Sequence, residues 1–447
     1  MRIIPTVFLL ASLAAMHLRL GTAAFSIQPS TKYVLEALRP THRSRLVPLR
    51  YRELEEDDDD STMLQVQTRA PPGFNMTENL ANRGPKSAMN LRLILALLIN
   101  QCLILLAANV ILAAIFFGTD GIDGFSHFQE ILHWGGEGNI DLTMSPIRVA
   151  LGFLGALPII AIGNLVENSD NRAFANVNFS TITMVLTLFG RRKSPPSEFL
   201  PERLKGTTMP TTGTMDVLLW SFALASATGI CEETVFRMEI PALLSHYFGG
   251  YPLLPLIGQA LLFGLGHAQP STGWAENIIV VGLQIVNGFI FGLLYLLSGG
   301  DLVPCIVAHA VYDFSVFFKT WIDANSQVEY AETMFLEPLP STVQKDVDQV
   351  LRAFGAKMDP RVFSAVKRLF YIFDFDKNKT LSKAEVRKGF SYLALEKAGN
   401  PPPQKEVDTL FDTYTSEKDK NRLSFVDFLR LYTQSGAFKD KGEKLKQ

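Results

Sequence analysis

Between Leu93 and Trp321 the chain is a succession of apolar runs joined by mostly short polar connections. The runs are Leu93–Phe117, Ile147–Val166, Phe174–Phe189, Met215–Ile230, Tyr251–Gly266, Ile278–Leu297 and Leu302–Trp321. Runs of about 20 apolar residues are long enough to cross a bilayer as helices. The sequence therefore predicts an α-helical fold, a multipass transmembrane bundle of about six to eight helices. The third run is either a tilted span or an interfacial helix.

Composition narrows the classes of partner. The formal net charge is −2, which gives no electrostatic reason to expect binding to nucleic acid. The three cysteines, Cys102, Cys231 and Cys305, all lie in apolar runs and are odd in number. No disulfide framework is therefore predicted.

The N-terminus has the composition of a two-part targeting leader. Residues 1–24 combine a basic Arg2, an apolar stretch and a small-residue site ending at Ala24, the layout of a secretory signal peptide. A short signal anchor is the alternative. Residues 25–52 are basic, hydroxylated and poor in acids, as in a transit peptide. Together they resemble the bipartite plastid leader of algae with secondary plastids, which favours a plastid membrane over the ER or another endomembrane. Residues 53–88 are predicted to be a disordered acidic and Pro-containing linker.

Three polar motifs occur in or beside the later apolar runs. They are Glu232-Glu233-x-x-x-Arg237, Phe263-x-x-x-His267 and His309-x-x-x-Asp313. Ionisable side chains are costly in hydrocarbon, so their presence in membrane helices indicates a functional site. Any one motif alone is more often a satisfied buried polar group. Three such motifs together favour function.

Helix geometry separates the roles of the two glutamates. Adjacent residues on a helix diverge by about 100°, so Glu232 and Glu233 are not expected to face one cavity. Glu233 and Arg237 are four residues apart, the spacing of a same-face ion pair. This pairing leaves Glu232 for chemistry. Burial makes a carboxylate a better proton acceptor, as a general base acting on water requires.

The two histidine motifs have the same four-residue spacing. Phe263 can pack beside His267 and fix its ring, and His309 and Asp313 share one helix face. Together with Glu232 they would supply an activated water and donors for an oxyanion. The predicted reaction is hydrolysis of a peptide bond inside the membrane.

These motifs resemble those of the type II CAAX prenyl endopeptidases and related bacterial intramembrane proteases. The resemblance covers roughly Met215 to Phe318 and includes the segments Leu261–Ala268 and Gly292–Tyr295. It implies that residues 211–325 are the catalytic region, preceded by N-terminal transmembrane helices at 89–210. The implied partners are membrane lipid and a peptide or protein substrate.

The resemblance also implies residue roles. Glu232 with His267 would activate the water, and His309 with residue 313 would hold the oxyanion. Met238 stands where the family commonly has Gly, which indicates a packing change. Asp313 stands where the eukaryotic enzymes carry Asn, and an ionised Asp would repel an oxyanion. It must therefore be protonated, be paired with His309 or ligate a metal.

A catalytic zinc ion is an alternative to the metal-free mechanism. Glu232, His267, His309 and Asp313 are all competent Zn²⁺ ligands. The sequence has no His-Glu-x-x-His helix, however. A metal-free mechanism with glutamate as the base is favoured.

Residues 374–385 form a twelve-residue EF-hand loop in the polar C-terminal part. The expected Ca²⁺ ligands are Asp374, Asp376, Asn378, the Thr380 carbonyl, Ser382 directly or through water, and bidentate Glu385. Lys379 occupies the position that normally needs Gly. A non-Gly residue with positive φ costs about 1 kcal/mol, which should weaken calcium binding. A metal-free EF-like fold is the alternative.

A second helix-loop-helix follows, and the two are expected to form an EF-hand pair over residues 361–436. In its loop, Lys418 and Lys420 occupy ligand positions and would repel calcium. We expect a degenerate hand that pairs with the first through Leu381 and Leu423 at the strand positions. Residues 326–360 are predicted to be a linker and a helix.

Two functions of different classes fit these patterns. The first is an intramembrane endopeptidase of the CAAX-processing type with a calcium-binding tail as regulator. The second is a non-catalytic plastid membrane scaffold that keeps the family fold and binds a partner. Glu232→Ala separates them, because an enzyme loses processing and a scaffold keeps its partner.

Overall fold

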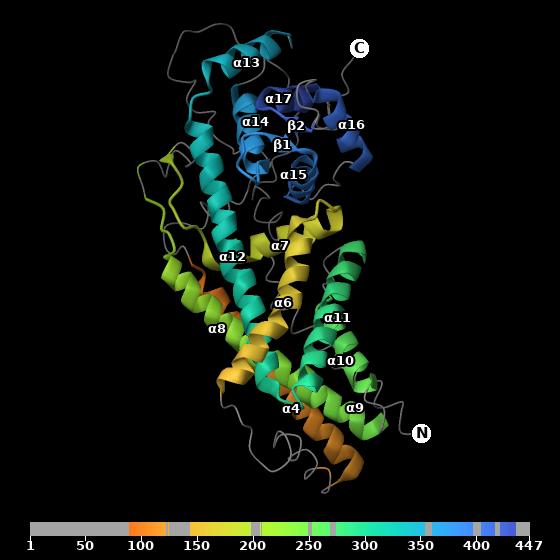
Figure 1. Cartoon of the computed structure of the whole chain (residues 1–447). Coiled ribbons are helices and arrows are strands. Elements are labelled where there is room, and N and C mark those ends of the chain that lie inside the picture. Colours follow the sequence, from red (N-terminus) through yellow and green to blue (C-terminus); the bar gives the residue numbers. More distant parts are fainter. Residues whose placement is uncertain are drawn as a thin grey trace, which may run out of the picture.

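The computed structural model describes residues 89–121, 124, 144–197, 206, 208–248, 253–268, 274–353, 360–396, 404–415 and 421–434. In this part the chain is almost entirely helical, as predicted, with a helical bundle below a smaller helical domain (Figure 1). The predicted signal peptide, transit-peptide-like segment and acidic linker lie outside the described residues.

Five helices of the described part are long and apolar enough to cross a membrane. They are α4 (Leu91–Asp120), α6 (Pro146–Asn168), the continuous helix α8–η3–α9 (Thr214–Glu233, Thr234–Glu239 and Ile240–Phe248), α11 (Trp274–Leu297) and α12 (Leu302–Leu336). Of the six to eight spans predicted, five meet these criteria within the described residues. Helix α10 (Leu253–Gly266) has only 14 residues, and α7 (Arg172–Phe189) is made too polar by its asparagines and hydroxylated residues.

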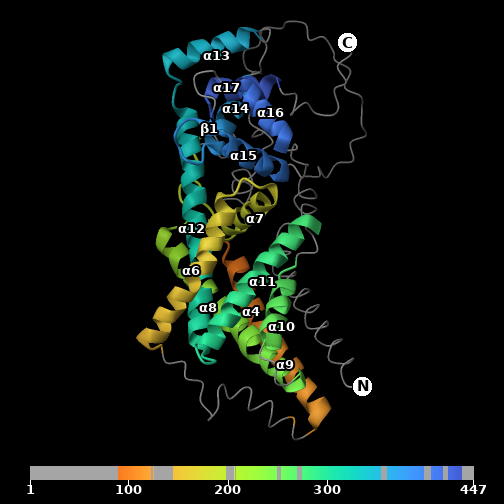
Figure 2. The ribbon, with the colours of Figure 1, turned by 45° about the vertical axis from the view of Figure 1, so that its right-hand side comes forward.

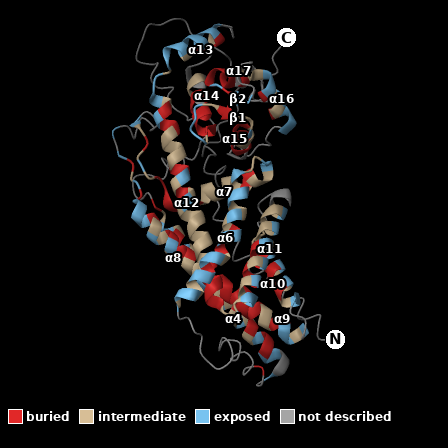
Figure 3. Cartoon of the chain, in the orientation of Figure 1, coloured by how far each residue is buried: buried red, intermediate tan, exposed pale blue. Residues whose placement is uncertain are grey.

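Many residues of the bundle helices are exposed (Figure 3), and large apolar side chains are among them. Leu106 of α4 is 59% exposed, Leu165 of α6 74% and Leu297 of α11 78%. Helices that are apolar on every side belong in hydrocarbon, because water would oppose such exposure. The described helices therefore form a multipass membrane bundle.

Helices α8 and α12 pack very closely beside the polar motifs. A Cβ atom at Gly229 of α8 would lie 2.9 Å from the Ile306 carbonyl oxygen of α12. The absent side chain lets the two backbones approach. Directly after Glu233 the helix widens into the π-turn η3, a local feature that is frequent at functional sites.

Helix α12 continues well beyond the bilayer. Its 35 residues span roughly 52 Å at 1.5 Å per residue, against a hydrocarbon core of about 30 Å. The domain boundary expected at residue 325 falls inside this helix. Figure 2 shows α12 running from the bundle to the C-terminal domain.

The C-terminal domain is a pair of helix-loop-helix units. Its elements are α13 (Ser341–Ala353), α14 (Pro360–Phe373), β1 (Leu381–Ser382), α15 (Lys383–Glu396), α16 (Gln404–Tyr414), β2 (Arg422–Leu423) and α17 (Phe425–Gln434). Strands β1 and β2 are antiparallel and pair Leu381 with Leu423, as the sequence predicted. Phe370, Phe373 and Phe428 are buried in the shared core.

Candidate active site and calcium-binding loop

The three polar motifs come together inside the bundle. Glu232 lies at the end of α8, His267 just after α10 and His309 on α12. Glu232 Oε2 is 3.8 Å from His267 Nε2 and 4.0 Å from His309 Nε2. These separations exceed a direct hydrogen bond. Glu232 is 5% exposed and His309 4%.

Glu233 holds two partners at once. Its Oε2 is 2.9 Å from Arg237 Nε, so the predicted four-residue ion pair is present. Its Oε1 accepts a hydrogen bond from His309 Nδ1 at 2.7 Å. The adjacent glutamates, which were not expected to face one cavity, both approach His309. The His309 ring lies between them and presents Nδ1 to Glu233 and Nε2 to Glu232.

Arg237 is enclosed by aromatic rings. Its guanidinium carbon lies 4.6 Å from the Phe263 ring centroid and 5.3 Å from that of Phe291, and the residue is 1% exposed. Phe291 also stacks on the His309 ring, with centroids 5.1 Å apart and planes 13° apart. Arg237 thus pairs with Glu233, and Phe291 contacts both Arg237 and His309.

The tautomer of His267 follows from its hydrogen bond. The Phe263 carbonyl oxygen, which can only accept, lies 2.8 Å from His267 Nδ1. The proton therefore sits on Nδ1 in the neutral ring, and Nε2 faces Glu232 with its lone pair. The Phe263 ring lies 4.6 Å from the imidazole, centroid to centroid, beside it as predicted.

Asp313 lies one turn after His309. Its Oδ2 is 3.5 Å from His309 Nε2. Of the three arrangements considered for this carboxylate, the geometry corresponds to pairing with His309.

The four proposed zinc ligands are not gathered as a metal site. Among the described residues, the only group of three or more His, Cys, Asp or Glu side chains with mutually close ligand atoms is Asp374, Asp376 and Glu385. Glu232 Oε2 instead lies 3.8 Å from His267 Nε2 and 4.0 Å from His309 Nε2.

Two residues of the site were missed by the sequence reasoning. Gln101 of α4 donates from Nε2 to Glu232 Oε1 at 3.2 Å, and Phe291 of α11 packs against His309 and Arg237. The polar pair Asn100-Gln101 inside an apolar run was a usable signal for the first. A phenylalanine in an apolar helix offers no comparable signal.

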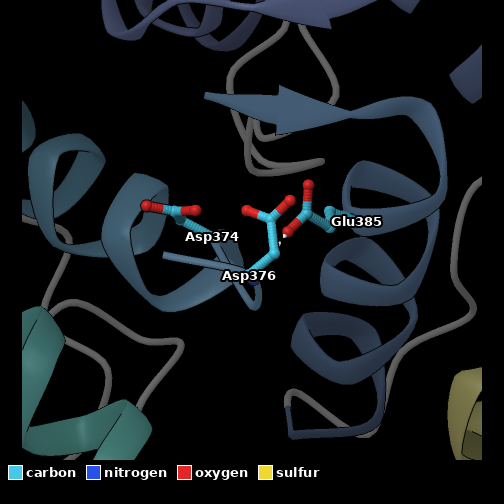
Figure 4. A group of neighbouring side chains, drawn as sticks. All are labelled: Asp374, Asp376 and Glu385. Carbon is cyan, nitrogen blue, oxygen red and sulfur yellow. Dashed lines mark hydrogen bonds between the residues drawn. The ribbon is translucent and has the colours of Figure 1, made fainter. Parts of the chain in front are cut away.

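The EF-hand loop has its acidic residues in place. Asp374, Asp376 and Glu385 present one carboxylate oxygen each, all within 4.8 Å of one another (Figure 4). The chemistry and spacing of this donor set fit Ca²⁺. Lys379 has φ 66°, the conformation for which the sequence predicted a cost. In the second loop, Lys418 and Lys420 lie outside the described residues.

Side chains of helix α12 form hydrogen bonds to the EF-hand loop and the residues just before it. The Gln327 amide donates to the carbonyl oxygens of Tyr371, Ile372 and Asp374 at 2.9–3.0 Å. The Tyr330 hydroxyl donates to Asp374 Oδ2. Burial raises the pKa of the Asp374 carboxyl, and the hydrogen bond from Tyr330 opposes that shift. Asp374, the first expected calcium ligand, is therefore hydrogen-bonded to α12, the helix that carries His309.

The opposite face of this extension is bound to the bundle. The Trp321 indole donates to the Gly190 carbonyl oxygen at 2.9 Å, and Glu329 pairs with Arg192 at 2.8 Å. At 3.6 residues per turn, Trp321 and Glu329 lie roughly opposite Gln327 and Tyr330. The bundle and the EF-hand domain thus both contact α12, on roughly opposite faces.

Comparison with protein families gives two matches. Residues 214–315 match the type II CAAX prenyl endopeptidase Rce1-like family, and residues 363–433 match the EF-hand domain pair. The chain therefore contains an Rce1-like type II CAAX prenyl endopeptidase domain followed by an EF-hand pair. No curated protein matches the chain, and no solved structure does.

Proposed function

We propose that this chain is an intramembrane endopeptidase in which Glu232 activates water for attack on a peptide bond. The observation that carries the proposal is the convergence of Glu232 Oε2 on two imidazoles from two other helices, at 3.8 and 4.0 Å. The family of residues 214–315 is one of proteases, which supports the same reaction class.

The residues divide the chemistry as follows. Glu232, aided by His267 Nε2, takes a proton from water, and the water oxygen bonds to the carbonyl carbon. His309, with both ring nitrogens protonated, donates through Nδ1 to Glu233 and offers Nε2–H to the oxyanion. When the tetrahedral intermediate collapses, the carbon–nitrogen bond of the peptide breaks, and Glu232 returns its proton to the leaving amine. Asp313 Oδ2 lies 3.5 Å from the same Nε2, so the oxyanion replaces Asp313 as the acceptor of this N–H, and the positive charge of the imidazolium offsets the negative charge of Asp313.

The reaction is tested with purified protein in lipid nanodiscs. The probe is an internally quenched peptide ending in a CAAX sequence, with its cysteine farnesylated or free. We expect wild-type protein to cleave at least one form and Glu232→Ala to cleave neither. Intact folding of both proteins with no cleavage by either favours the scaffold instead. Equal cleavage by Glu232→Ala rules out the proposed base.

We further propose that calcium at the first EF-hand regulates this activity through α12. Support comes from the hydrogen bonds of Gln327 and Tyr330 to the loop. Coupling between two sites is reciprocal, so a helix that supports a calcium ligand also transmits the effect of its occupancy. The proposed compartment, a plastid membrane, rests on the composition of the leader alone.

Tyr330→Phe tests this link with the loss of one hydroxyl. A hydrogen bond to a charged group contributes about 1.5–3 kcal/mol, so we expect calcium affinity to fall at least tenfold. Thr333→Val is the matched control, because the Thr333 hydroxyl bonds only within α12, to the Glu329 carbonyl oxygen at 2.8 Å. Isothermal titration with Ca²⁺ measures both. Equal calcium affinities of wild type and Tyr330→Phe contradict the link. Peptide cleavage rates that are the same with and without Ca²⁺ contradict it as well.

A further inference from the structure

Gln101 is a polar residue that α4 contributes to the active site. Its Nε2 donates to Glu232 Oε1 at 3.2 Å, while Glu232 Oε2 lies between the imidazoles. A carboxylate oxygen only accepts, so the amide nitrogen of Gln101 must face it. One oxygen of Glu232 is thus held from α4, and the other lies near both imidazoles.

This contact lies outside the part of the chain that the protease family covers. The family match begins at residue 214, whereas α4 ends at Asp120. The candidate active site therefore includes a residue from α4, a helix outside the segment that matches the family.

Gln101 is not a residue that the stability of the fold would favour at this position. Its Oε1 is buried and accepts no hydrogen bond within the described part of the chain. A buried acceptor left unsatisfied destabilises a fold, and an apolar residue of similar shape would avoid that cost. Gln259 of α10 also has a buried Oε1 that accepts no hydrogen bond within the described residues, but its amide nitrogen bridges the Leu256 and Gly288 carbonyl oxygens and joins α10 to α11.

We propose that Gln101 is a positioning residue for Glu232, on the assumption that the proposed function holds. Its amide fixes the carboxylate so that Oε2 points at the water and the imidazoles. The same N–H stabilises the ionised form of Glu232, which is the form that accepts a proton.

Gln101→Met keeps the shape of the side chain and removes the donor. In nanodiscs with the quenched peptide, we expect kcat to fall on the order of ten- to a hundredfold with little change in KM. The acid limb of the kcat/KM profile should move to higher pH. The melting temperature should stay nearly level, because removal of the unsatisfied Oε1 offsets the loss of one hydrogen bond, whereas Gln259→Met loses two.

Gln259→Met is the matched control. It should lower the melting temperature and leave the acid limb in place, the signature of a structural glutamine. Gln101→Met overturns the inference if it behaves like Gln259→Met, or if its kcat and acid limb equal those of wild type. The proposed function fails by a different result, namely full activity of Glu232→Ala.

Discussion

Arg237→Met is expected to destabilise the membrane domain by about 3–5 kcal/mol, because it leaves a buried charge uncompensated. Arg237 and Glu233 are both fully buried in their ion pair. Methionine fills much of the same volume among the rings of Phe263 and Phe291 but supplies no charge. Glu233 would keep only His309 as its partner.

Denaturant titration in detergent micelles measures this loss. Arg148→Met is the matched control, because Arg148 pairs with Asp301 at a similar 2.7 Å with both side chains partly exposed. Such pairs contribute about 0–1 kcal/mol. The double variant Arg237→Met with Glu233→Gln should recover much of the stability. If Arg237→Met and Arg148→Met lower the free energy of unfolding equally, the buried Glu233–Arg237 pair does not stabilise the domain more than an exposed pair does.

His309→Gln is expected to lower kcat by about 10²–10³-fold with little effect on KM, the size typical for loss of an oxyanion donor. The glutamine amide is a single donor group and will be engaged by Glu233, which holds His309 Nδ1 at 2.7 Å in the native site. No donor then remains at the Nε2 position. Steady-state kinetics on the quenched peptide report the change.

His246→Gln is the control for this substitution. His246 lies on α9, exposed, with its ring 5.1 Å from that of Phe116. Its replacement should leave kcat unchanged. If both variants lose activity equally, the loss reports packing of the bundle, and the oxyanion role of His309 is rejected.

Local spacing predicted the parts of the site that lie within one helix turn. The pairs Glu233–Arg237 and Phe263–His267 are four residues apart, and the structure contains both contacts. The positive φ of Lys379 followed from the fixed geometry of an EF-hand loop. In each case the chain connectivity alone determines the geometry.

Contacts between helices could not be predicted in the same way. Gln101 and Glu232 are 131 residues apart, and Glu233 and His309 are 76 apart. Which faces of two apolar helices meet depends on the packing of the whole bundle, and apolar residues on every side carry little directional information.

Helix α12 is longer than the apolar run from which its end was predicted. The sequence turns polar after Trp321, which suggested the end of the span. Yet neither Gly nor Pro occurs from Cys305 to Leu336, so nothing breaks the helix. The span and the support of the calcium loop are therefore one helix.

The central claim is that Glu232 and His267 act together on one water, and a double-mutant cycle tests it most directly. The quenched peptide is hydrolysed by wild type, Glu232→Gln, His267→Gln and the double variant, all folded in nanodiscs. Groups that act as a unit give strongly non-additive losses. We predict that the double variant is no slower than Glu232→Gln alone. Losses that multiply, so that each substitution keeps its full effect in the presence of the other, would contradict the account.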